Sequence, residues 1–216
     1  MTLAQLNTRM RLGVQRTDLT ADGVDDYSVF LNQAQREICR LHSFVWMKTT
    51  ATVIILAGAS SAALPATFKE LTRAKSPVHL VGADATTLQT PVDVWPLEKV
   101  KRRNRAQLDR IPAAVAVDRS VNPPELTTGA GTSDSDSDLT FSVQHYAFPA
   151  DLVADADYNR LTTEMPEMLL AKAKAIAFAA VNDAAAVDFE QMFQFKFRET
   201  RQADTLLEVA GVDLRM

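Results

Sequence analysis

One amphipathic segment near the start of the chain constrains the fold more than any other. Residues 25–46 read DDYSVFLNQAQREICRLHSFVW. Their apolar side chains recur at helical spacing and so share one face of a helix; they are Tyr27, Phe30, Leu31, Ala34, Ile38 and Leu41. After Trp46 the apolar period changes to two, which is typical of a strand. The segment therefore predicts a helix over about 25–42 that leads into a β-rich region.

Three more helices are predicted around that β-rich region. Residues 2–15 carry apolar side chains on one face, and residues 166–184 are rich in alanine, the best helix former, with Pro166 at the first turn. The last helix is expected over about 186–210, ending before Gly211. Between the two pairs of helices, short β-branched and alternating segments predict several strands.

This order of elements predicts an α+β fold. We expect a four-helix bundle with a β-rich subdomain inserted between the second and third helices. The bundle would comprise residues 1–46 and 150–216, and the inserted subdomain residues 47–149. Chain ends that lie close together are typical of such insertions.

Composition excludes several classes of protein. The formal net charge is −4, so the chain as a whole is not built to grip nucleic acid. Its single cysteine, Cys39, has no partner for a disulfide or a CxxC motif. No apolar run approaches the ~20 residues of a membrane span, and the N-terminal segment lacks the features of a signal peptide. We therefore expect cytoplasmic synthesis and no membrane association.

Signatures of enzymes are absent from the sequence. Neither a glycine-rich phosphate loop nor a GxSxG or HExxH motif occurs. The three histidines, His42, His79 and His145, are scattered, and their spacing suggests no catalytic or metal-binding group. The alternating acidic run at 134–138 lacks the glycine and the closing glutamate of an EF-hand loop. We expect no catalytic site, no cofactor and no metal.

The basic residues concentrate in one short segment. They are Lys99, Lys101, Arg102, Arg103, Arg105 and Arg110. Three interpretations stay open: a solvated surface, salt bridges at a protein interface, or contact with nucleic acid phosphates. No series of aromatic side chains for base stacking is interleaved with these charges.

The predicted last helix carries more aromatic residues than one face of a bundle can bury. Residues 189–197 read FEQMFQFKF. Either the core is crowded there, or some rings pack against another subunit, since exposed apolar patches usually mark interaction sites. Phe193, Phe195 and Phe197 are therefore candidate interface residues. On the polar side of the helix over 25–42, Arg36 and Arg40 are further candidates for a subunit contact.

Several sequence features together resemble a known family. The pattern DxxxFLNxAQREI runs from Asp26 to Ile38 and leads to Trp46, followed by TTATxxxxAG from Thr49 and then LPATF from Leu64. Later in the chain come PADL from Pro149 and an alanine-rich helix after Pro166. In these features the chain resembles the head-to-tail adaptor (connector) proteins of tailed bacteriophages.

The resemblance implies a structural protein of the virion without catalytic activity. Such proteins form a ring, commonly a dodecamer, at the head–tail junction, after synthesis in the host cytoplasm. The ring docks onto the portal protein, extends the channel through which genomic DNA passes without sequence-specific binding, and offers a platform for tail or nozzle proteins. The alternative from the residues alone is a DNA-binding accessory protein that uses the basic segment 99–110.

Overall fold

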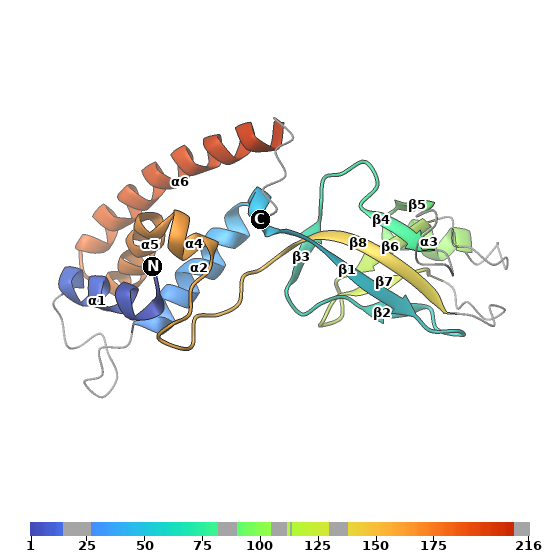
Figure 1. Cartoon of the computed structure of the whole chain (residues 1–216), viewed down its shortest axis with the longest axis horizontal. Coiled ribbons are helices and arrows are strands. Elements are labelled where there is room, and N and C mark those ends of the chain that lie inside the picture. The colour runs from blue at the N-terminus through green and yellow to red at the C-terminus, as the bar shows by residue number, and fades with distance from the viewer. Residues whose placement is uncertain (15–26, 82–89, 105–111, 113, 130–137, 210–216) are drawn as a thin grey trace. The chain divides into compact units, whose positions relative to one another are not determined.

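The computed structural model describes residues 1–14, 27–81, 90–104, 112, 114–129 and 138–209. The chain divides into two compact units (Figure 1). A helical unit contains residues Met1–Trp46 and Phe148–Met216, and a β unit contains residues Met47–Ala147.

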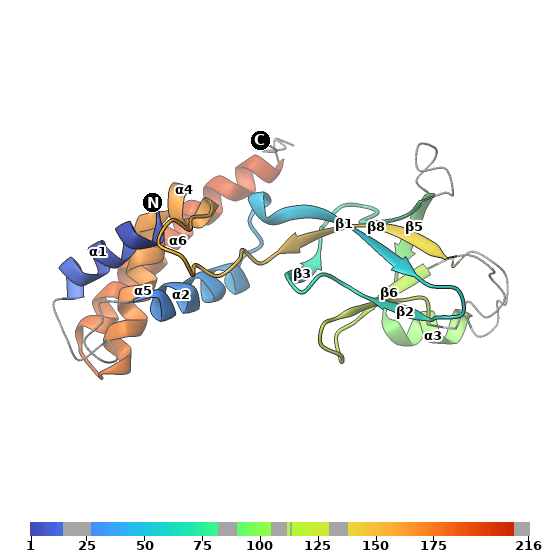
Figure 2. The ribbon, with the colours of Figure 1, turned by 60° about the horizontal axis from the view of Figure 1, so that its bottom comes forward.

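The helical unit is built around one central helix. Its helices are α1 (Leu3–Val14), α2 (Ser28–Leu41), α4 (Arg160–Glu164), α5 (Pro166–Ala180) and α6 (Ala185–Val209). The alanine-rich α5 packs against each of the other four (Figure 2). Small alanine side chains let neighbouring helices approach closely on several sides, so α5 is buried around most of its circumference.

The helix α2 follows the predicted amphipathic pattern, with a shifted buried face. Leu31, Ala34 and Ile38 are buried as the spacing predicts. Gln35 is also fully buried, whereas Leu41 at the last position of α2 is 58% exposed. The buried face therefore includes a polar side chain, which is possible because the amide of Gln35 donates to the carbonyl of Ala150 (2.8 Å). The predicted start at Asp25 and Asp26 lies outside the described residues.

The β unit is a single mixed sheet that nearly closes on itself. Its strands are β1 (Lys48–Ile55), β2 (Ser61–Ala63), β3 (Phe68–Leu71), β4 (Val78–Val81), β5 (Thr90–Val94), β6 (Ala114–Asp118), β7 (Glu125–Thr127) and β8 (Leu139–Ala147). They follow the order β1-β8-β4-β5-β6-β7-β2, with β3 also paired to β8. The pair β5–β6 is parallel, and α3 (Leu97–Asn104) lies on the crossover between these two strands. The terminal strands β1 and β2 lie close together without a ladder between them, so the sheet resembles an almost closed barrel.

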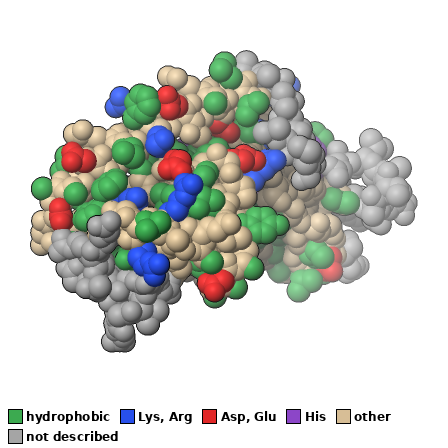
Figure 3. Space-filling view, turned by 60° about the vertical axis from the view of Figure 1, so that its left-hand side comes forward, with side chains coloured by type: hydrophobic (Ala, Val, Ile, Leu, Met, Phe, Trp, Pro, Cys, Tyr) green, Lys and Arg blue, Asp and Glu red, His purple; other side chains and the backbone are tan. Residues whose placement is uncertain are grey.

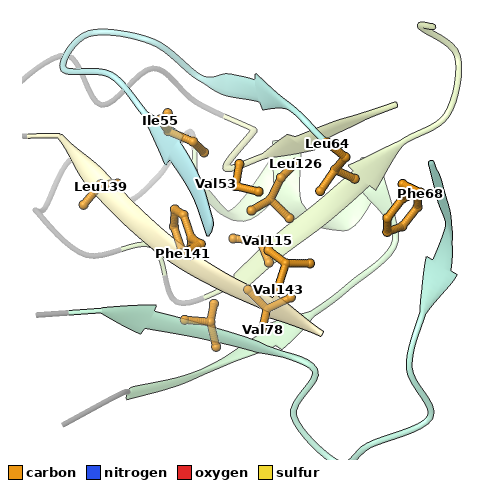
Figure 4. Close-up of a cluster of buried hydrophobic side chains, with 11 residues drawn as sticks. Val53, Ile55, Leu64, Phe68, Val78, Val115, Leu126, Leu139, Phe141 and Val143 are labelled. Carbon is orange, nitrogen blue, oxygen red and sulfur yellow. The ribbon is translucent and has the colours of Figure 1, made fainter. Parts of the chain in front are cut away.

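The interior of this sheet is filled by alternate residues of its strands. On β8, Leu139, Phe141 and Val143 are buried while the residues between them are partly exposed, as the sequence predicts. They pack against side chains from β1, β4, β6 and β7 (Figure 4). The buried cluster comprises Val53, Ile55, Leu64, Phe68, Val78, Val92, Val115, Leu126, Leu139, Phe141 and Val143.

The predicted fold class is wrong. The described residues contain six α-helices together with the eight-stranded, nearly closed mixed sheet, rather than a four-helix bundle with an insert. The helix α4 was missed because five residues are too short for a periodic pattern; reciprocal hydrogen bonds between Asn159 and Thr162 start it instead. The closure of the sheet was missed because it depends on pairing between distant strands, which local patterns do not encode.

Candidate interaction surfaces

Two of the candidate aromatic residues lie on the inner face of α6, in the core of the helical unit. Phe193 is fully buried, and Phe197 is 8% exposed. Their ring centroids lie 5.5 Å apart, and Phe197 meets Phe44 edge-on at 6.5 Å. Phe189, one turn before Phe193, stacks on Phe178 of α5 at 5.3 Å. These rings therefore hold α6 against its own unit.

The outer face of α6 carries apolar side chains that have no such role. Phe195 is 64% exposed and Leu206 is 71% exposed. Eleven residues are about three helical turns, so both side chains lie on the same side of α6. A shallow groove of about 580 Å³ beside Leu206 is lined by Arg198, Arg201, Gln202 and Thr205. The surface of the helical unit drawn in Figure 3 likewise intersperses hydrophobic with charged side chains.

The polar side of α2 holds the segment that follows the β unit in sequence. Arg36 binds the carboxylate of Asp151 through both Nε and Nη2, with Nε at 3.2 Å from Oδ1. The amide of Asn32 donates to the carbonyl of Leu152 (2.9 Å) and accepts from its N–H (2.8 Å). The structure thus gives Arg36 an intramolecular partner, while Arg40 is exposed.

A lysine at the meeting point of three helices bridges two carboxylates. The ammonium of Lys172 on α5 lies 3.1 Å from Glu37 of α2 and 3.0 Å from Glu190 of α6. It also lies 5.0 Å from the centre of the Phe193 ring. Burial alone would lower the pKa of Lys172, but its hydrogen bonds to Glu190 and Glu37 outweigh burial and raise that pKa. Burial alone would raise the pKa of Glu37, but its hydrogen bonds with Gln33 and Lys172 outweigh burial and lower that pKa.

A second lysine of α5 lies in a groove between α1, α5 and α6. The groove, of about 270 Å³, is lined by apolar side chains together with Arg9, Glu167 and Lys174. Arg9 pairs with Glu167. Burial, reinforced by Arg9 and opposed by Glu167, lowers the pKa of Lys174. Gly13 makes room for this lysine, because a Cβ there would lie 2.1 Å from its Nζ.

The basic segment lies on α3 in the β unit. Lys99 places its Nζ 3.8 Å from the centre of the Trp95 ring, which binds a cation over its face. Lys99 and Arg102 are exposed, and both line a shallow depression of about 640 Å³ with Trp95, Pro96 and Glu98. Lys101 is half-buried. The side chain of Arg103 and all of Arg105 and Arg110 lie outside the described residues.

Neighbouring backbone packs closely against this helix. Gly129 has a φ of +77°, and a Cβ there would lie 2.9 Å from the backbone N of Lys101. Hydrogen bonds from Ser120, with a smaller contribution from Lys101, lower the pKa of Asp118. One of the positive charges on α3 therefore already faces a carboxylate of its own unit.

An aspartate on α6 anchors the chain just after α2. Asp204 is 6% exposed, and its carboxylate lies 2.8 Å from Nε2 of His42 and accepts a hydrogen bond from the N–H of Val45 (3.0 Å). The ring of His42 meets that of Phe44 edge-on at 4.7 Å. The sequence does not predict the roles of Asp204 and Lys172. Their partners lie on other segments of the chain, and a single charged residue in a helix gives no local pattern that would indicate a buried contact.

No group of three or more metal-ligating side chains occurs among the residues that the structure describes. Of the histidines, His42 pairs with Asp204, and His145 is buried with its ring 5.4 Å from that of Phe68. The described helices include none that is long and apolar enough to cross a bilayer. What the surfaces offer are apolar and charged contact areas on helices, which suit binding to other proteins.

Comparison with known proteins assigns a family. The family model of the SU10 adaptor protein matches residues 1–212, nearly the whole chain. A comparison with curated proteins finds no match. The family match confirms the resemblance to phage head-to-tail adaptors that the segment from Asp26 to Phe68 indicates. The chain therefore belongs to the SU10 adaptor protein family.

Proposed function

We propose that the protein is a subunit of a head-to-tail adaptor ring in a tailed phage virion, without enzymatic activity. In this role the ring, predicted to be a dodecamer, docks onto the portal protein and extends the DNA channel toward the tail or nozzle proteins. Membership of the adaptor family supports this role. The two units would serve as separate domains, residues 1–46 with 150–216 and residues 47–149. DNA would pass the ring without sequence-specific binding.

The observation that carries the proposal is the exposed apolar face of α6. A soluble chain that stayed alone would gain nothing from exposing Phe195 and Leu206 on the same side of its longest helix. A ring needs one surface patch of each subunit to meet a different patch of its neighbour. We assign the outer face of α6 to this contact with a neighbouring copy. Arg198 and Arg201 would add charged contacts at its margin.

The change Phe195→Glu tests this assignment. A charge in place of an exposed ring leaves the isolated subunit stable within about 0.5 kcal/mol, as is usual for surface substitutions. It should abolish assembly of the oligomeric ring. Native mass spectrometry and negative-stain microscopy of the purified protein with its portal measure this. Val29→Glu on α2 is the matched control, since Val29 is 70% exposed on another helix.

Two results would count against the proposed function. If the unaltered protein stays monomeric and never binds portal, the adaptor role is wrong. If Phe195→Glu assembles as well as Val29→Glu does, the ring forms through another surface. The experiment therefore separates a failure of the function from a failure of the assigned contact.

A second candidate function is binding of DNA by α3. Exposed Lys99 and Arg102, with half-buried Lys101, provide positive charge on one short helix. A gel-shift titration over salt concentration tests it, because binding through phosphate contacts weakens steeply as salt rises. Absence of binding at low salt removes this candidate.

A further inference from the structure

A short turn in the helical unit exposes two large hydrophobic side chains. It comprises residues 153–158, which precede α4. Val153 is 82% exposed and Tyr158 is 69% exposed, which is as much as the apolar residues on the outer face of α6. Tyrosine is among the residues that most often dominate the affinity of protein interfaces. The turn is therefore a second surface of this unit that suits binding to another protein.

Hydrogen bonds hold this turn in one conformation. The carboxylate of Asp157 accepts from the N–H groups of Val153 and Ala154, each at 2.8 Å. Two carbonyl groups of the turn also accept from N–H groups at the start of α1, at 2.9 and 3.1 Å. The exposed side chains thus stand on an ordered backbone, which reduces the entropy that is lost when they bind a partner.

The turn is acidic, whereas the groove on α6 is basic. Asp155 is exposed and forms no ion pair within the described part of the chain. Arg198 and Arg201, which line the groove beside Leu206, are exposed and likewise lack an ion pair with any described residue. Opposite charges of this kind favour contact between the two surfaces and disfavour wrong pairings.

The basic side chains of α6 lie along one flank of its apolar outer face. At about 100° of rotation per residue, Arg198 and Arg201 turn to one side of the line that joins Phe195 to Leu206. Glu199 turns to the other side of that line. The outer face of α6 therefore has an apolar centre with a positive border on the side of the groove.

The turn and the outer face of α6 lie on opposite sides of the helical unit. In Figure 1, α6 runs along the upper side of this unit and the chain between β8 and α4 runs along the lower side. Figure 2 brings that lower side forward and shows the same connection in front, with α6 behind it. A contact that repeats around a ring needs two such surfaces, because each subunit meets one neighbour through each of them.

Other exposed apolar residues of the helical unit match the basic groove less well. Leu12 follows Arg11 and Leu41 follows Arg40, so both would bring positive charge to the arginines of α6. Contact between two α6 faces would do the same, and its two-fold symmetry would close after two copies. The acidic turn combines apolar side chains with the opposite charge, so a second copy of this chain carries a matching surface.

We propose that the turn at 153–158 of each subunit docks onto the outer face of α6 of the next subunit. The inference rests on the adaptor function proposed above and names the second surface of the subunit contact. The two exposed side chains of the turn would cover Phe195 and Leu206, and Asp155 would pair with the arginines of the groove. The apolar contact supplies most of the affinity, since exposed ion pairs contribute little, and the charges determine which surfaces meet.

An exchange of charges tests this contact. Asp155→Arg alone, or Arg198→Glu together with Arg201→Glu, should raise the concentration needed for ring assembly on the portal at least about tenfold, because like charges then meet. All three changes in one chain should return that concentration to within about threefold of the unaltered value. Native mass spectrometry over a range of concentrations measures assembly, and the midpoint of urea denaturation of each isolated subunit should not shift.

A second aspartate provides the matched control for this exchange. Asp93 on β5 is exposed and, like Asp155, has no ion pair among the described residues. Asp93→Arg should not restore assembly when it is combined with the two glutamate substitutions on α6. Equal restoration by Asp93→Arg and Asp155→Arg would show that only net charge matters, and would overturn the proposed contact.

Cysteine crosslinking tests directly which surfaces meet. The native Cys39 is fully buried, so introduced cysteines on the surface react selectively. A chain with both Ala156→Cys and Gln202→Cys should give a ladder of covalent oligomers beyond the dimer when it is assembled on the portal and treated with a short bismaleimide. Each single-cysteine chain should stay monomeric. Dimers from Gln202→Cys alone would reveal contact between two α6 faces and overturn the proposal.

The outcomes separate this contact from the adaptor function. Tyr158→Ala should weaken assembly at least about tenfold, whereas Val29→Ala, at a similarly exposed position of α2, should leave it unchanged. If the unaltered protein forms its ring, and Tyr158→Ala and Asp155→Arg assemble equally well, another surface covers α6 and the proposal is wrong. If the unaltered protein never forms a ring on the portal, the adaptor function itself fails.

Discussion

Lys172 joins α5 to two other helices of the helical unit through two ion pairs. Its ammonium holds Glu37 of α2 and Glu190 of α6 at hydrogen-bonding distance, and its own side chain is only 13% exposed. Both glutamates are about one-third exposed, so water screens them in part. The three groups link the consecutive helices α5 and α6 to α2, which lies far from them in the sequence.

Lys172→Met should lower the free energy of unfolding by about 1–2 kcal/mol, because it leaves two half-buried carboxylates side by side without a cation. Urea denaturation of the isolated protein measures this. Arg9→Met is the control: Arg9 and Glu167 are each more than half exposed, and loss of that pair should cost less than about 1 kcal/mol. Equal losses in both variants would contradict a special role for Lys172.

The stabilisation from these groups should depend on pH in two separate windows. Because the pKa of Lys172 is raised in the folded state, its contribution is complete below its unfolded pKa of about 10.4 and is lost as pH rises through the folded value. The pKa of Glu37 is lowered, so its contribution is complete above about 4.3 and is lost as pH falls through the folded value. Urea denaturation across pH should show both losses, and both should shrink in Lys172→Met.

Two phenylalanines, two positions apart on α6, should behave oppositely. Phe193→Ala removes a fully buried ring and should cost about 3–5 kcal/mol of subunit stability. Phe195→Ala removes a ring that is 64% exposed and should change subunit stability by less than about 1 kcal/mol. Thermal unfolding of the two variants distinguishes them, and a large loss in Phe195→Ala would place that ring in the core.

At the scale of elements, a few specific contacts hold the ends of helices and the connecting segments in place in both units. Hydrogen bonds between Asn159 and Thr162 start α4, and the carbonyl of Ala150 is held by Gln35. In the β unit the chain after β7 passes so close to α3 that only glycine fits at position 129. The reciprocal hydrogen bonds of Asn159 and Thr162, rather than helix propensity alone, set where α4 begins.

Gly129→Ala should destabilise the protein more than Gly58→Ala does. Both glycines have a positive φ, of +77° and +78°, which costs an alanine about 1–2 kcal/mol. At Gly58 the added methyl group meets no other atom within 4 Å, whereas at Gly129 it meets backbone atoms of Lys101. The difference in unfolding free energy should be about 1 kcal/mol or more, measured by urea denaturation. Equal losses would show that α3 shifts freely.

At the scale of the whole molecule, sequence reasoning captured the order of elements and the family, but not the architecture. The apolar spacing of Leu31, Ala34 and Ile38 predicted α2, and the alternation on β8 predicted its buried face. The strand order β1-β8-β4-β5-β6-β7-β2 depends on pairings between residues up to about 100 positions apart, for which the sequence has no local signal. The candidate site shows the same limit, because the pattern of 189–197 left Phe193 and Phe197 as candidates for a subunit contact, although both rings are buried within the helical unit.

The contact of Asp204 with Val45 is another long-range feature, and it should stabilise the whole helical unit. Asp204→Ala leaves the buried N–H of Val45 without its acceptor and should cost about 1–3 kcal/mol. The amide of Val45 should also exchange faster. Glu199→Ala, an exposed position on the same helix, is the control and should stay within about 0.5 kcal/mol. Unchanged exchange at Val45 would contradict the anchoring role.

These anchors leave both connections between the two units short. The backbone passes between the two units twice, near Trp46 and near Phe148. On the helical side Asp204 holds Val45, and Gln35 holds the carbonyl of Ala150. On the β side Lys48 and Tyr146 are already partners in the β1–β8 ladder. Only two residues lie between Val45 and Lys48, and only three between Tyr146 and Ala150, so each connection runs directly from a contact of one unit to a contact of the other along the chain.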